Sequence, residues 1–160
     1  MGRIYTVSFT GTLAAASGDI DLLEVLPAAN KPVKLRGMVL GQLSEVGDAA
    51  EEGVRISVLR MAATVTSGNG TGTTPIPVDS ADVAAGMTAE TNGATVATTS
   101  GATVVLAELA WNIRNSPWDF WWPDDRFAPK AKNAEGLFVR LQTTLADDIT
   151  AAMTFFLEEE

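Results

Sequence analysis

The sequence predicts an all-β protein, an antiparallel β-sandwich with Greek-key or jelly-roll-like connections. Apolar and polar residues alternate with a period of two in segment after segment between residues 4 and 158, as in strands with one buried face. Turn-forming residues separate many of these segments, and no long segment repeats convincingly with the helical period. A chain of 160 residues suits one domain, residues 1–160, with a single core.

The first 60 residues predict four strands. The first contains Tyr5, Val7 and Phe9 on one face, and residues 19–26 form the second. Residues 27–32 form a corner into a long third strand, and residues 54–58 supply the fourth. The third strand is expected to place one set of residues on its core face, namely Val33, Leu35, Gly37, Val39 and Leu43, and Lys34, Arg36 and Gln42 on the other.

Residues 62–103 form a long insertion rich in Ala, Thr, Gly and Ser. Because structureless loops of this length are uncommon, we expect local order within it. Asp79 and Ser80 are predicted to cap a short helical turn over residues 81–85. Asn92-Gly93 is the signal of a type I′ hairpin, here between residues 87–91 and 94–98.

Four further strands follow the insertion, each predicted from its alternation. Their expected core faces are Val105, Ala107, Leu109, Trp111 and Ile113; Trp118, Phe120 and Trp122; Leu137, Val139 and Leu141; and Ile149, Ala151, Met153, Phe155 and Leu157. Short strands and the absence of a long helix together favour the sandwich.

Composition excludes several functional classes. The chain has neither histidine nor cysteine, so the common general base, thiol nucleophile and soft metal ligands are missing, and we expect neither an enzyme nor a cofactor. With 11 basic and 20 acidic residues, a net charge of -9 repels a phosphate backbone, so nucleic acid is not an expected partner. No apolar run approaches the ~20 residues of a membrane helix, so no membrane partner is expected either.

Two acidic groups are candidates for a cation site or a charged end. Glu45, Asp48, Glu51 and Glu52 could offer oxygens to calcium, but they lack the spacing of the common calcium loop. We interpret them as a solvated loop and predict no metal site. Residues 158–160, three glutamates, are interpreted as a solubilising end.

The tryptophans gather in one short segment, and two interpretations compete for them. The group consists of Trp111, Trp118, Trp121 and Trp122, beside Asp119, Asp124 and Asp125. It could be a sugar-stacking platform, as in a carbohydrate-binding module, or part of a glycosidase. We favour a strand with its even-numbered aromatic residues inward and Trp121 outward toward a protein partner. Arg126 and Phe127 extend this candidate partner interface.

Several stretches resemble small capsid decoration, or cement, proteins of tailed bacteriophages. They are Arg3-Ile4-Tyr5-Thr6-Val7, Leu26-Pro27-Ala28-Ala29-Asn30-Lys31-Pro32 leading into Leu35-Arg36-Gly37, Gly47-Asp48-Ala49-Ala50-Glu51-Glu52, and Trp111-Asn112-Ile113-Arg114, with a last strand ending in glutamates.

The resemblance implies a jelly-roll-like sandwich on the capsid exterior of a virion, made in the bacterial host cytoplasm. It implies a homotrimer that stabilises the shell by bridging major capsid protein subunits, and it carries over no catalytic residue. The alternative is a carbohydrate- or receptor-binding head module that uses the Trp111–Trp122 aromatic cluster.

Overall fold

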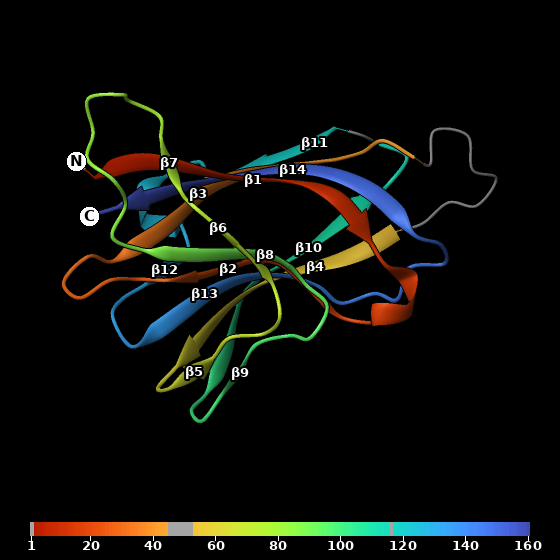
Figure 1. Ribbon diagram of the computed structural model, residues 1–160, viewed down its shortest axis with the longest axis horizontal. Helices are drawn as coiled ribbons and strands as arrows, with labels where there is room; N and C mark the ends of the chain where they lie inside the picture. The colour runs from red at the N-terminus through yellow and green to blue at the C-terminus, as the bar shows by residue number, and fades with distance from the viewer. Residues whose placement is uncertain (1, 45–52, 116) are drawn as a thin grey trace.

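The computed structural model describes residues 2–44, 53–115 and 117–160. It shows two antiparallel sheets packed face to face, so the predicted all-β sandwich is confirmed (Figure 1). The first sheet consists, from edge to edge, of β11 (Trp118–Trp121), β3 (Val33–Gln42), β14 (Ile149–Glu159), β1 (Arg3–Leu13) and β7 (Ile76–Pro77), with β12 (Lys130–Ala131) also paired to β3. The second consists of β10 (Thr103–Asn112), β4 (Gly53–Ala62), β13 (Glu135–Leu141), β2 (Ile20–Leu26), β8 (Thr88–Gly93) and β6 (Thr71–Thr73).

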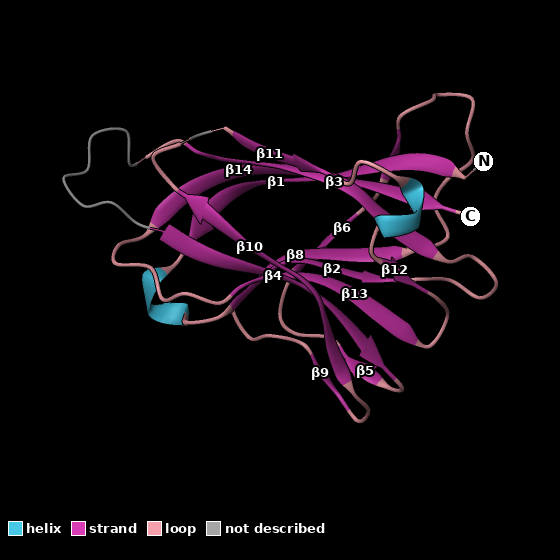
Figure 2. Ribbon diagram, turned by 180° about the vertical axis from the view of Figure 1, so that it is seen from behind, coloured by secondary structure: helices cyan, strands magenta, loops and turns pink. Residues whose placement is uncertain are grey.

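The strand order is that of a jelly roll. Without the insertion strands and β12, the chain order is β1, β2, β3, β4, β10, β11, β13, β14. Numbered in this order, strands 1, 8, 3 and 6 (β1, β14, β3 and β11) are neighbours in one sheet. Strands 2, 7, 4 and 5 (β2, β13, β4 and β10) are neighbours in the other. The chain thus alternates between sheets as two interleaved Greek keys do. Both termini consequently lie at one end of the sandwich (Figure 2).

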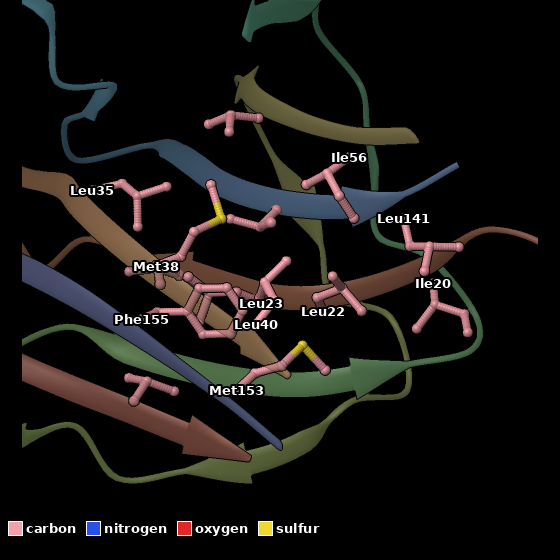
Figure 3. Packing of buried hydrophobic residues seen from close by; sticks show 14 of the residues in the cluster. Ile20, Leu22, Leu23, Leu35, Met38, Leu40, Ile56, Leu141, Met153 and Phe155 are labelled. Atoms are coloured by element: carbon pink, nitrogen blue, oxygen red, sulfur yellow. The ribbon is translucent and has the colours of Figure 1, made fainter. Parts of the chain in front are cut away.

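The core lies between the sheets and follows the predicted alternation in most strands. Tyr5 and Val7 are fully buried on β1, as are the five predicted core residues of β14 within a few per cent. Met38, Leu40, Met153 and Phe155 from the first sheet are packed with Leu22, Leu23, Ile56 and Leu141 from the second (Figure 3). The alternation therefore selects the buried face wherever the strand runs without a bulge.

The predicted core face of the third strand is wrong beyond Leu35. In the pairing of β3 with β14, Leu157 lies opposite Leu35 and Phe156 opposite Gly37, so Arg36 is an extra residue on β3. Such a bulge reverses the inward and outward positions that follow it. Met38 and Leu40 are buried in place of Val39, and Leu43 is 61% exposed.

The predicted core face of β10 is wrong before a second bulge. Val105 pairs with Leu59 and Ala107 with Val58, which leaves Leu106 as the extra residue. Trp111 stays on the core side, fully buried, but Val105 is 52% exposed. The predicted face holds only after the bulge.

The insertion between β4 and β10 extends both sheets at the same side of the sandwich. β7 pairs with β1, and β8 pairs with β2 and carries β6 outside it. β5 (Val65–Thr66) and β9 (Thr98–Thr99) form a separate pair that projects from the second sheet (Figure 1). Beneath it lies a second small core on the outer face of that sheet, consisting of Leu59, Met61, Ala97 and Phe138.

Neither local prediction within the insertion holds. Asp79 does accept a hydrogen bond from the backbone N–H of Ala81 (2.9 Å), but residues 79–82 form a turn rather than a helix. Asn92 has the positive φ of 56° that its hairpin signal favours, yet β8 continues alongside β2, with Gly93 opposite Asp21. Pairing with a distant strand outweighs the local turn preference here.

Candidate functional site

Strand β11 presents Trp121 on the outer face of the first sheet. It is antiparallel to β3, with Trp118 opposite Leu40 and Trp121 opposite Gly37. Trp118 and Phe120, together with Trp122 just after the strand, pack against the core, while Trp121 is 48% exposed. The structure therefore places Trp121 outward, as the period of two predicts.

The ring of Trp121 is held in place by its neighbours on the sheet. A Cβ atom at Gly37 would overlap the indole, so only glycine leaves room for the ring to lie on the backbone of β3. The ring also contacts Phe156 of β14, with centroids 4.7 Å apart. An exposed indole fixed in this way loses little conformational entropy on binding a partner.

The other two predicted interface residues follow in a 3-10 turn, η2 (Asp125–Phe127). Asp124 accepts hydrogen bonds from the Arg126 backbone N–H (2.8 Å), Nε (3.0 Å) and Nη2 (2.9 Å). These bonds lower the pKa of Asp124 below its usual range. Phe127 is 67% exposed. We call Trp121, Arg126 and Phe127 the aromatic patch.

An open cleft of about 770 Å³ adjoins the turn. We call it the charged cleft; its lining is Gly2, Ile4, Lys34, Arg36, Asp125, Glu158 and Glu160. Asp125 thus belongs to the same turn as Phe127 and also to the cleft. The two features form neighbouring parts of one surface.

Ion pairs organise the charged cleft. Lys34 Nζ lies 2.8 Å from Asp125 Oδ2 and 2.5 Å from Glu160 Oε1. Arg36 pairs with Asp125 and with Glu158 (3.2 Å). The hydrogen bonds that Lys34 donates to Asp125 and Glu160 raise the pKa of Lys34, and the Lys34 ammonium lowers the pKa of Asp125. Both cations of the cleft are therefore paired with carboxylates, which outnumber them by three to two.

The C-terminal glutamates are structural, which corrects their interpretation as a solubilising end. Glu158 is buried and accepts a hydrogen bond from the Gly2 backbone N–H (2.9 Å). Glu159 is also buried and accepts from the Gly86 N–H, 2.9 Å from each of its carboxylate oxygens. Glu160 pairs with Lys130 as well as Lys34. The last strand thus fixes the N-terminus and the insertion.

Two of the three aspartates of the glycosidase interpretation, Asp124 and Asp125, are stabilised in their ionised forms. The bonds from Arg126 to Asp124 and from Lys34 to Asp125 lower both carboxyl pKa values. A glycosidase acid needs a raised pKa, so neither residue has the environment of that role.

Some predicted residues lie elsewhere. Trp111 is fully buried and therefore does not belong to the surface. The acidic loop residues Glu45, Asp48, Glu51 and Glu52 lie outside the described residues. Within the described ranges, no group of three or more carboxylates is placed to hold a metal ion. None of the helices found there has the length and hydrophobicity that a membrane span requires.

Sequence reasoning missed the charged cleft. Its signal is the position of Lys34 and Arg36 on a strand otherwise rich in apolar residues, opposite a strand that ends in glutamates. That signal can be interpreted only when it is known that β3 and β14, which are more than 100 residues apart in the chain, pair with each other.

Comparisons with known proteins leave the family open. No family model matches the chain, and no curated protein matches it. A solved structure of the Gx strain of infectious bursal disease virus is similar at 13% identity and a TM-score of 0.21, over 99% of this chain and 42% of that chain. The chain thus spans less than half of that relative, and a likeness this low carries no argument about function.

Proposed function

We propose that the protein is a non-enzymatic structural virion protein that binds the outside of a phage capsid and stabilises it by bridging major capsid protein subunits. The observation that carries the proposal is the aromatic patch. Trp121 is an exposed aromatic residue on the first sheet, and Phe127 is exposed in the turn that follows, next in sequence to Arg126, whose guanidinium is bonded to Asp124. Tryptophan and arginine are the residue types that dominate binding energy at protein interfaces.

Three further features support the same function. The resemblance to decoration proteins covers most of the chain. The jelly-roll order agrees with the fold that this family implies. The charge of -9 disfavours binding to packaged DNA and suits a protein on the shell exterior.

A bridging protein gains avidity when several weak contacts are made together, so a homo-oligomer, most simply a trimer, belongs to the proposal. Light scattering across a concentration series, with and without capsids, tests this component. A monomer under both conditions contradicts it.

The sugar-binding alternative has less support from the geometry. A stacking platform needs several exposed rings, but Trp111 is fully buried and Trp118 and Trp122 pack against the core. Trp121 is the one tryptophan of the four that is exposed, and its ring already packs on Gly37 and Phe156.

The test is co-sedimentation with expanded capsids built from the major capsid protein encoded with this chain, together with a thermal disruption curve. Added protein is expected to sediment with the capsids and to raise their disruption temperature, because a ligand of the intact shell stabilises it. Trp121→Ala is expected to weaken binding about tenfold or more, as for an interface hot spot.

Two matched variants sharpen this test. Gly37→Ala keeps the tryptophan but displaces its ring, so it should weaken binding as well. Val105→Ala removes exposed apolar surface from the second sheet and should leave binding unchanged. If the wild-type protein stays in the supernatant and the disruption temperature does not move, the proposal fails. Glycan-array binding that is lost in Trp121→Ala would instead establish the sugar-binding alternative.

A further inference from the structure

Two glutamates face one another under the insertion. Glu24 of β2 lies directly opposite Glu90 of β8 in the antiparallel register, so both side chains are on the same face of the second sheet. Glu24 is only 4% exposed. Glu24 Oε1 and Glu90 Oε2 are both inaccessible and have no hydrogen-bond partner within the described residues.

The loop before β6 covers this pair closely. The Gly68 backbone N–H points to Glu24 Oε2 at 3.4 Å. At Gly70, an added Cβ would lie 2.9 Å from Glu90 Cβ and 3.1 Å from Glu90 Oε2. The loop therefore closes over the carboxyl groups without room for a side chain at Gly70.

The charged groups around the pair do not neutralise it. Asp21, on the same strand as Glu24, adds a further negative charge nearby. Arg140 of β13 is bonded to Asp21 (2.6 Å) and to the Ala97 carbonyl. None of the ion pairs of the described chain includes Glu24 or Glu90.

We propose that Glu24 and Glu90 share one proton, and that this proton holds residues 67–72 closed over the second sheet. Two ionised carboxylates on directly opposite residues repel one another, and each has one oxygen that is withdrawn from water and has no donor. A single added proton supplies one O–H donor for the facing carboxylate oxygen and removes one of the two charges. This proton-linked closure is independent of the proposed capsid function.

The direction of the pKa shift of Glu24 agrees with a bound proton. Burial raises the pKa of Glu24 above its ordinary value of 4.5 and is the largest effect, hydrogen bonds from Ser67 and Gly68 oppose it, and the charges of Glu90 and Asp21 add smaller increases. A raised folded pKa means that the folded protein binds the proton more tightly than the unfolded chain. Its stabilising contribution is complete below pH 4.5 and is lost as the pH rises through the folded pKa.

Hydrogen exchange of the whole chain over a pH series at constant ionic strength tests the proposal. After correction for the intrinsic exchange rate, protection of residues 67–72 should fall by up to about tenfold per pH unit above the folded pKa. Glu24→Gln and, separately, Glu90→Gln retain a donor and remove one charge. Each should keep the loop protected at neutral pH and flatten the profile.

Asp147→Asn is the matched control, because Asp147 is exposed and the substitution changes the net charge equally. It should reproduce the wild-type profile. A pH-independent wild-type profile overturns the proposal, as does a Glu24→Gln profile identical to that of Asp147→Asn. If calcium instead raises the melting temperature of the wild type but not of Glu24→Gln, the two oxygens bind a cation and the shared proton is wrong.

Discussion

The indole of Trp111 shows how packing and hydrogen bonding oppose each other within one residue. The side chain is fully buried in the main core, yet its Nε1–H has no acceptor among the described residues. Burying such a donor costs about 1–3 kcal/mol. The large apolar surface of the ring must outweigh that cost for tryptophan to be favourable at this position.

Two substitutions at Trp111 separate these contributions. Trp111→Ala should lower the free energy of unfolding by about 3–5 kcal/mol, as expected for removal of a buried large aromatic side chain. Trp111→Phe loses part of the ring but also the unpaired donor, so its cost should be under about 2 kcal/mol. Urea unfolding of both variants measures the difference. If Trp111→Phe cost as much as Trp111→Ala, indole packing alone would determine the preference for tryptophan at this position.

At the scale of elements, one buried ion pair connects the insertion to the second sheet. Arg140 of β13 bonds Asp21 of β2 through Nε (2.6 Å) and Nη2 (3.1 Å). The two backbone groups of Ala97 complete the arrangement: its N–H donates to Asp21 (2.7 Å), and its carbonyl accepts from Arg140 (3.0 Å). The pair therefore positions the segment that leads into β9.

Removing both partners should cost less than the sum of the costs of removing each one alone. Asp21→Ala or Arg140→Ala leaves an uncompensated buried charge, with an expected cost of about 3–5 kcal/mol. The double variant should cost clearly less than the sum of the two. A double-mutant cycle by chemical denaturation measures this coupling, and additive costs would contradict it.

At the scale of the whole molecule, the ion pairs near the two termini make the free energy of unfolding depend on pH in the acid range. Lys130 and then Lys34 lower the pKa of Glu160 below its ordinary value of 4.5. A lowered folded pKa contributes stability that is present above pH 4.5 and is lost as the pH falls through the folded pKa. This dependence is opposite in sign to that of Glu24.

Glu160→Gln tests the acid dependence. At neutral pH it should lower the free energy of unfolding by no more than about 1 kcal/mol, because the Glu160 side chain is one-third exposed and solvent screens the pair. The deficit should shrink as the pH falls below 4.5 and as salt is added. Thermal unfolding at several pH values measures it. A deficit that stays constant down to acid pH would show that the loss is one of packing instead.

Much of the fold could be predicted from local patterns. The alternation of Tyr5 and Val7, and of the residues along β14, follows from the geometry of a strand and requires no knowledge of its neighbours. The same rule places Trp121 outward between two inward aromatic residues. The composition likewise determines the net charge and the absence of histidine and cysteine, since neither property depends on contacts between residues.

The tertiary structure decided what local patterns could not. Arg36 and Leu106 are bulges only because partner strands skip them, and each reverses the faces that a uniform period assigns. Asn92-Gly93 has the local signal of a hairpin, but β2 offers β8 a longer pairing. The roles of Glu24 and Glu158 depend on residues 66 and 156 positions away in the chain. A sequence pattern specifies which face of a strand is apolar, whereas register, bulges and charge pairing are set by which strand lies alongside.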